Sequence, residues 1–344
     1  MHPSTIAFPE NLNALLKEFL SNRNYSQVGL LMDENTKKLC YSLILDGLPE
    51  HQLMEIKAGE GHKNIETCIQ VWQQLTEFGF DRHSLLIILG GGVVGDLGGF
   101  CASTFKRGID FLLLPTTLLS QVDSSIGGKL GIDFQNYKNH IGVFQEPVGT
   151  FISTLFLKTL PERELRSGFA EVVKHCLISD TAMWNKVRSK SLSDQHWEEL
   201  IRHSVAFKHS VIERDPKENG LRKILNFGHS IGHSVEGHFL ATTKPIFHGE
   251  AVAIGMIAEA FIGFKKGLLT DSELSQITRY LVHIFGHIEL PANEKDLLER
   301  IKQDKKNLGN RILIALPQGI GKAVWDVGVS EDEIVQSLDF YRSL

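Results

Sequence analysis

The chain has 344 residues, of which 42% are hydrophobic, with 31 glycines and 10 prolines. This composition is typical of a folded globular protein and excludes a disordered or collagen-like one, and the length favours two domains. A formal net charge of −5 and a pI near 6.3 indicate no extended basic surface, so we expect no nucleic-acid partner.

The N-terminus, MHPSTIAFPENLN, has no basic segment followed by an apolar one, so no secretory signal is predicted. The most apolar segment starts at Glu250, is short and contains Glu259, which predicts a core helix and no membrane partner. The cysteines form no CxxC pair, which favours reduced thiols in a cytoplasmic protein. They are Cys40, Cys68, Cys101 and Cys176.

Short apolar runs alternate with amphipathic segments in the first part of the chain. The runs with strand character cover residues 27–33, 53–58, 85–90 and 111–115, with a helical pattern over about 65–79. This alternation predicts a Rossmann-like α/β domain whose parallel sheet is covered by helices on both faces. It ends after a further apolar run over 148–153.

The second part of the chain shows mainly helical patterns from about residue 161 onward. One late apolar run, over 311–317, predicts a single isolated strand. We therefore expect an α/β domain over residues 1–155, followed by a mainly α-helical domain over residues 156–344.

A glycine-rich loop follows the apolar run LLIILG. Gly90, Gly92 and Gly95 have GxGxxG spacing, which lets the backbone approach a pyrophosphate at a helix N-terminus. The nearest acidic residue, Asp110, comes before the next strand rather than after it, so Asp33 is the better partner for a ribose. A tight strand-to-helix turn fits the glycines almost equally well, and both interpretations stay open.

The segment LRKILNFGHSIGH, residues 221–233, predicts one amphipathic helix. Its polar members would form a single stripe consisting of Arg222, Asn226, His229 and His233. Two imidazoles one turn apart are able to hold a metal ion, although a helical histidine is more often a hydrogen-bonded structural residue.

Charged residues gather in two further places. Lys129, Lys138 and Asn139 lie in a region of glycines and small polar residues that suits phosphate binding. Glu171 and Lys174 are three residues apart in an otherwise apolar predicted helix, where burying both charges is costly unless they are used.

Nine ordered segments together resemble the 3-dehydroquinate synthases, within the sugar phosphate cyclases, and the similarity runs from about residue 29 to residue 324. They begin at Asp33 (DEN), Ala58 (AGEGHK), Gly90 (GGGVVGD), Pro115 (PTTLLSQVDSSIGGKLGID), Tyr137 (YKNHIG), Lys158 (KTLPERELRSGFAEVVKH), Gly220 (GLRKILNFGHSIGH), His248 (HGEAVAIGM) and Asp304 (DKKN). The resemblance implies that residues 1–155 bind NAD and that residues 156–344 bind substrate and a divalent metal, zinc or cobalt.

Carried over position by position, the resemblance implies that the metal ligands are Glu171, His229 and His248. The implied cofactor contacts are Asp33, Glu60, Lys63, Gly91, Gly92, Asp96, Thr116, Thr117, Lys129, Lys138, Phe156, Thr159 and Leu160. The implied catalytic and substrate-binding residues are Arg107, Asp123, Lys129, Lys138, Asn139, Lys174, Lys208, Arg222, Asn226, His233 and Lys306.

The activity implied is conversion of 3-deoxy-D-arabino-heptulosonate 7-phosphate to 3-dehydroquinate and phosphate, in the shikimate pathway of aromatic amino acid biosynthesis. It combines transient oxidation by NAD+, phosphate elimination, re-reduction and intramolecular aldol closure. The resemblance also suggests a cytoplasmic homodimer with a small sugar acid phosphate as its substrate.

Three alternative functions make different demands on these residues. Related cyclases whose substrates lack a carboxylate depart at the position of Asn226 and in some cases at that of His233, both of which are kept here. An NAD- and metal-dependent polyol dehydrogenase shares the layout but has no need of the phosphate lysines. A binding module with a decayed site is disfavoured because the metal ligands and Lys174 are intact.

Four residues depart from the usual family pattern without removing a functional side chain. Leu130 stands where threonine is usual, Tyr137 where glycine is common, His140 where an apolar residue is common, and Pro216 where glutamate is usual.

Overall fold

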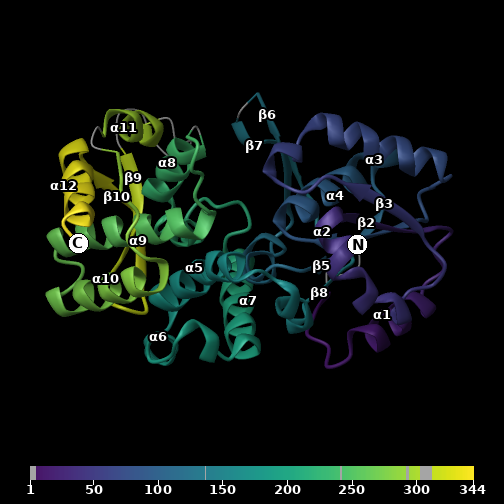
Figure 1. Ribbon diagram of the computed structural model, residues 1–344, viewed down its shortest axis with the longest axis horizontal. Coiled ribbons are helices and arrows are strands. Elements are labelled where there is room, and N and C mark those ends of the chain that lie inside the picture. Colours follow the sequence, from purple (N-terminus) through teal and green to yellow (C-terminus); the bar gives the residue numbers. More distant parts are fainter. Residues whose placement is uncertain (1–4, 136, 241, 292–293, 303–311) are drawn as a thin grey trace. The chain divides into compact units, whose positions relative to one another are not determined.

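The computed structural model describes residues 5–135, 137–240, 242–291, 294–302 and 312–344. The chain divides into two compact units, Met1–Pro161 and Glu162–Leu344 (Figure 1). The first is an α/β unit and the second is mainly helical, which confirms the predicted fold class.

The N-terminal unit contains a six-stranded parallel sheet with the strand order β1-β8-β5-β4-β2-β3. Its strands are β1 (Thr5–Ala7), β2 (Val28–Asp33), β3 (Gln52–Ile56), β4 (Leu85–Gly90), β5 (Asp110–Pro115) and β8 (Gly149–Phe151). Its helices are α1 (Leu12–Ser21), α2 (Glu34–Leu39), α3 (Ile65–Glu77) and α4 (Gly92–Thr104). Shorter helical turns are η1 (Tyr41–Leu43), η2 (Leu45–Gly47), η3 (Glu60–His62), η4 (Phe105–Arg107), η5 (Ser120–Ser124) and η6 (Thr154–Thr159).

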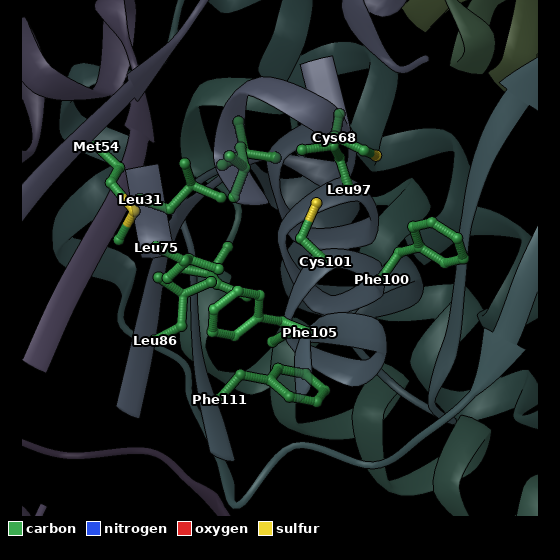
Figure 2. Packing of buried hydrophobic residues seen from close by; sticks show 14 of the residues in the cluster. Leu31, Met54, Cys68, Leu75, Leu86, Leu97, Phe100, Cys101, Phe105 and Phe111 are labelled. Atoms are coloured by element: carbon green, nitrogen blue, oxygen red, sulfur yellow. The ribbon is translucent and has the colours of Figure 1, made fainter. Parts of the chain in front are cut away.

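Strand β4 is buried along its whole length because helices cover both faces of the sheet. Successive side chains point to opposite faces, so Leu86 and Ile88 join one hydrophobic cluster, whereas Leu85, Ile87 and Leu89 join another. Figure 2 shows the first cluster, in which side chains of the sheet meet those of α3 and α4.

An antiparallel hairpin, β6 (Lys129–Phe134) and β7 (Tyr137–Phe144), projects from this unit (Figure 1). The glycines and small polar residues of this region indicated phosphate binding, and neither strand was predicted. The glycines are typical of a loop, yet here they allow close strand approach: a Cβ on Gly142 would lie 2.4 Å from the carbonyl oxygen of Leu130. Leu130 itself is buried against Gly99 of α4, so its departure from the family pattern serves packing.

The C-terminal unit is built around the buried helix α9, which contacts α5, α8, α10 and α12 (Figure 1). Its helices are α5 (Glu162–Ser179), α6 (Thr181–Arg188), α7 (Trp197–Arg214), α8 (His229–Leu240), α9 (His248–Lys265), α10 (Asp271–Phe285), α11 (Lys295–Lys302) and α12 (Glu331–Arg342). Its shorter helical turns are η7 (Leu192–Asp194) and η8 (Leu221–Asn226). Among the described helices, none has both the length and the apolar character needed to cross a membrane.

The late apolar run forms β9 (Ile312–Pro317), but the prediction that it is isolated was wrong. It pairs antiparallel with β10 (Ala323–Val329). Strand β10 is irregular between Val324 and Val327, and Asp326 has a φ of +56°, which breaks the two-residue alternation that a strand prediction needs.

The predicted single helix over residues 221–233 was also wrong. Residues 221–226 form the short turn η8, and α8 begins only at His229. Gly228 separates them with a φ of +81°, which a right-handed helix cannot contain. The four polar residues therefore do not share one helical stripe.

Glycines bring α8 and α5 unusually close to α9. A Cβ on Gly255 would lie 2.0 Å from the carbonyl oxygen of Gly228, and one on Gly249 would lie 2.0 Å from that of Ser167. A Cβ on Gly232 would lie 3.0 Å from the carbonyl oxygen of Ala251. Close backbone packing therefore fixes the ends of α8 and α9 relative to α5.

Candidate metal centre and nucleotide site

Three residues from these helices converge in the C-terminal unit. Glu171 lies within α5, while His229 and His248 are the first residues of α8 and α9. Each offers a ligand atom, and these atoms all lie within 4.8 Å of one another. The predicted metal ligands are thus brought together by three segments that are far apart in the sequence.

Both imidazoles have the ring nitrogen Nδ1 engaged and Nε2 directed toward Glu171. His248 Nδ1 lies 3.2 Å from Glu236 Oε2, and His229 Nδ1 lies 3.2 Å from the carbonyl oxygen of Phe227. The two Nε2 atoms lie 3.5 and 3.3 Å from Glu171 Oε1, respectively. Metal-binding histidines commonly donate their second N–H to a carboxylate or carbonyl in this way.

The carboxylate of Glu171 is fully buried: Oε2 is paired with Lys174, and Oε1 faces the Nε2 atoms of the two imidazoles. Its charge is balanced by the ion pair with Lys174, which is itself 1% exposed. Burial raises the pKa of Glu171, but Lys174 and His229 together hold it well below its ordinary value. A buried anionic carboxylate with two Nε2 atoms beside it is a donor set that suits zinc or cobalt.

The surrounding charges act differently on the two imidazoles. Burial and Lys174 lower the pKa of His229, which keeps that ring neutral. Burial also lowers the pKa of His248, but the carboxylates of Glu171 and Glu236 outweigh it and raise the pKa to about 10. The carboxylates of Glu171 and Glu236 therefore stabilise positive charge at the position of His248.

Other predicted residues of this unit lie near the cluster or on elements that contact it. The ring of His233 is exposed, with its centroid 4.9 Å from that of His229. Lys208 of α7 and Arg222 of η8 are buried, and η8 contacts both α5 and α7. Asn226 donates to Glu218 Oε1 over 2.8 Å. Lys306 lies outside the described residues.

Pro216, which departs from the family pattern, contacts Arg222 through its backbone. The guanidinium donates to the carbonyl oxygen of Pro216 over 2.8 Å, and the backbone N–H of Arg222 donates to Asp215. Because the proline contributes only its carbonyl group, the usual side chain is not needed for this contact.

Sequence reasoning missed Glu236 and Glu218. Glu236 falls two turns after His229 on the same helix face, so its proximity to a ligand was readable from spacing once α8 was placed. Glu218 precedes η8 with a φ of +60°, a local conformation that no sequence pattern indicates.

In the N-terminal unit, the chain order of the sheet reverses between β2 and β4. From β2 the chain passes to β3 on one side, and β4 then pairs with β2 on the other. Parallel sheets bind ligands at the carboxyl ends of strands around such a point. Asp33 ends β2 and caps α2, because its Oδ1 accepts from the backbone N–H of Thr36 over 2.7 Å.

The glycine-rich loop joins β4 to α4 at the same edge. Gly91 precedes α4, which has no side-chain cap at its N-terminus. A Cβ on Gly90 would clash with Val94 at 2.4 Å, whereas one on Gly95 would meet nothing within 4 Å. Gly90 therefore fits the interpretation as a tight strand-to-helix turn. Packing does not require a glycine at Gly95, where the surface of α4 is open. Gly91, Asp96 and Ser124 line a small depression there.

Lys63 links three parts of this unit. Its side chain is buried, and Nζ donates to Asp96 Oδ2 and to Asn139 Oδ1 over 2.6 Å each. Asp133 bonds to both Lys63 and Asn139, since its backbone N–H donates to the Lys63 carbonyl oxygen and its Oδ1 accepts from the Asn139 backbone N–H, over 2.8 Å each. Lys63 and Asp96, which are expected to contact the cofactor, thus lie next to Asn139, which is expected to contact phosphate.

The remaining predicted residues of this unit occupy varied positions. Lys129 and Lys138 are exposed on the hairpin, and Arg107 is exposed in η4 with a φ of +69°. Of the predicted cofactor contacts, Thr116 and Phe156 are buried, the latter in the core cluster around α1. Intermediate or exposed positions are held by Glu60, Gly92, Thr117, Asp123, Thr159 and Leu160.

Two protein-family models match consecutive parts of the chain. The 3-dehydroquinate synthase N-terminal family matches residues 53–167, and the 3-dehydroquinate synthase C-terminal family matches residues 168–307. A 3-dehydroquinate synthase of Parabacteroides distasonis is 38% identical, over 99% of both chains. One from Dictyoglomus thermophilum is 39% identical, over 94% of this chain and 92% of its own length.

Solved structures with the same fold include a cyclase and a dehydrogenase. The 2-epi-5-epi-valiolone synthase of Streptomyces hygroscopicus, with NAD+ and Zn2+ bound, has a TM-score of 0.89 and 26% identity, covering 100% of this chain and 98% of its own. An iron-containing alcohol dehydrogenase of Corynebacterium glutamicum has a TM-score of 0.68 at 14% identity, covering 99% and 95%, which indicates a shared fold alone.

With an α/β unit followed by a helical unit, the chain falls in the class of proteins with the dehydroquinate synthase-like fold, which the valiolone synthase and the iron-containing alcohol dehydrogenase share. Within that class, the chain belongs to the 3-dehydroquinate synthase family.

Proposed function

We propose that this chain is an NAD- and divalent-metal-dependent enzyme that converts 3-deoxy-D-arabino-heptulosonate 7-phosphate to 3-dehydroquinate and phosphate. The observation that carries the proposal is the buried Glu171 carboxylate, which faces the Nε2 atoms of two histidines brought to it from the starts of α8 and α9. Membership of the family supports the choice of reaction.

The ligands of the metal are Glu171, His229 and His248, and the N-terminal unit binds NAD around Asp33 and the loop at Gly91. When bound, NAD+ supplies reversible hydride transfer and the divalent ion supplies polarisation of the substrate hydroxyl. Lys174 holds Glu171 in its anionic form, and Glu236 keeps the proton of His248 on Nδ1, away from the ion.

The substrate is a dianionic phosphate that also carries a carboxylate, so its recognition requires cations in a chain of net charge −5. Lys129, Lys138 and Asn139 hold the phosphate, and the bond from Lys63 fixes the amide of Asn139 for that contact. Arg222, Asn226 and Lys208 orient the carboxylate and hydroxyls. This work is chiefly positioning and electrostatic stabilisation.

Further roles follow the family pattern. His233, beside the cluster, contacts the substrate or relays a proton, and Arg107, Asp123 and Lys306 complete the substrate contacts. The predicted cofactor contacts, from Glu60 to Leu160, act through side chains or through backbone groups, as at the buried Phe156.

Related cyclases are the main competing function, because the valiolone synthase shares the fold at a TM-score of 0.89. The retained pair of Arg222 and Asn226 favours a substrate with a carboxylate. A purified-protein assay distinguishes them: heptulosonate phosphate should release phosphate and give a cyclic product in a reaction that needs catalytic NAD and stops with chelator. Turnover of a carboxylate-free sugar phosphate alone would overturn the assignment, and net NADH formation from a polyol would favour a dehydrogenase.

The protein works as a cytoplasmic homodimer in this proposal. Four exposed apolar side chains, Phe134, Tyr137, Ile141 and Phe144, lie on the hairpin, and Phe144 is 71% exposed. Among the described residues β7 pairs only with β6, so its outer edge offers a surface for a second copy. The four cysteines are free and buried, as in proteins of reducing compartments. Sedimentation of the wild type against a Phe144→Ser variant tests the dimer.

A further inference from the structure

Glu259 is a fully buried carboxylate that the reaction outlined above does not use. It lies on α9, about three turns after His248. Its Oε2 accepts a hydrogen bond from the backbone N–H of Gly228 over 2.6 Å, and its Oε1 accepts one from that of Ile231 over 3.0 Å. Both bonds reach the first turn of a different helix, α8.

Helix α8 cannot cap its own N-terminus at this position. Gly228, which precedes His229, has no side chain, and its φ of +81° favours glycine. A Cβ there would also lie 2.5 Å from Met256 Cγ. The first N–H groups of a helix need partners, and a carboxylate at that end also interacts favourably with the helix dipole. The acceptor therefore comes from α9.

The two N–H groups that Glu259 accepts flank His229 in the sequence. Gly255, one turn earlier on α9, provides the close approach to the same end of α8. Helix α9 thus carries His248 at its first residue and fixes the backbone around His229 through Gly255 and Glu259. We propose that Glu259 is a positioning residue for the metal site, setting the separation of the His229 and His248 imidazoles. This inference rests on the proposed metal ligands.

If Glu259 were only a helix cap, its loss would lower the stability of the unit but would change metal affinity no more than the loss of another cap does. The C-terminal unit contains such a cap: Glu273 accepts from the backbone N–H groups of Thr270 and Ile320 over 2.8 and 3.1 Å. Glu273 lies on α10 and is only half-buried, and its Oε2 also accepts from the Thr270 hydroxyl over 2.8 Å, but each of its oxygens likewise accepts one backbone N–H. Glu273→Gln therefore serves as the control variant for Glu259→Gln.

The test measures Co2+ binding to the metal-free full-length protein, together with the visible spectrum of the bound ion and the unfolding temperature. Glu259→Gln replaces one accepting oxygen with a donating amide group, so we expect affinity to fall about 10–100-fold, as for other residues that orient metal ligands, with an altered spectrum. Glu273→Gln should keep the wild-type affinity and spectrum even if it unfolds earlier. Equal affinity in Glu259→Gln and wild type would overturn the inference.

Two further variants separate a failure of this inference from a wrong ligand assignment and from a failure to fold. His229→Ala should abolish tight binding; if it does not, the proposed ligands themselves are wrong, independently of Glu259. If Glu259→Gln does not fold, Glu259→Asp keeps the charge but shortens the reach by one methylene. We expect that variant to fold with weakened Co2+ binding, and wild-type binding by it would refute the positioning role.

Discussion

Replacing Gly255 by alanine should separate two of the proposed metal ligands. The added Cβ would lie 2.0 Å from the carbonyl oxygen of Gly228 and 2.7 Å from the backbone nitrogen of Gly232. Ordinary contact begins at 3.4 Å, so the N-terminus of α8 must retreat by about 1.4 Å. Because both obstructing atoms belong to the backbone, no side chain can rotate to relieve the contact.

A metal site tolerates much less movement than this. Functional sites need their groups within about 0.5 Å of the productive geometry. Gly255→Ala should therefore weaken Zn2+ binding severely, and overpacking should destabilise the unit by about 1–3 kcal/mol. The assays are titration of the metal-free protein with Zn2+ and thermal unfolding in the presence of chelator.

The same substitution at Gly263 provides the control. Gly263 lies on α9 as well, but its nearest obstacles, the carbonyl oxygen and Cδ of Pro317 and Cδ1 of Leu269, are 3.5–3.7 Å away. Gly263→Ala should bind zinc normally and gain up to about 1 kcal/mol from the better helix propensity of alanine. If Gly255→Ala matches Gly263→Ala in zinc affinity, close packing of α8 on α9 does not determine the site.

Three other outcomes follow from the site. Glu236→Gln should keep the fold but lose about 10–100-fold in metal affinity, because His248 loses the carboxylate that orients it; unchanged affinity in a metal titration would contradict this. Lys129→Ala should raise the KM for heptulosonate phosphate by about 10–100-fold, the equivalent of one charge-assisted hydrogen bond, and alter the NAD dissociation constant less. Dialysis against chelator should stop turnover and lower the unfolding temperature, both restored by Zn2+ or Co2+, since an ion at about 100 times its dissociation constant contributes about 2.7 kcal/mol.

Features with a strong local signal were predicted well from sequence. The apolar run 85–90 coincides with β4, because a strand buried on both faces is continuously hydrophobic. Glu171 and Lys174 form the buried ion pair that their spacing on a helix indicates. The resemblance to the 3-dehydroquinate synthases supplied His248, which no helical spacing connects to His229.

The errors arose where distant parts of the chain decide local structure. Gly228 interrupts the segment 221–233 because α9 approaches too closely for a side chain there. Glu259 looked like a polar interruption of an apolar helix, but it is buried because its partners are N–H groups of α8. The hairpin β6–β7 was hidden by its glycines, which permit the strands to approach.

The most direct test of the metal centre is anomalous scattering from crystals of the zinc-loaded protein. The ion should lie about 2.0–2.2 Å from a carboxylate oxygen of Glu171 and from the Nε2 atoms of His229 and His248. A peak on His233 and Glu236, whose ligand atoms also cluster with His248, or no zinc beside Glu171, would contradict the account.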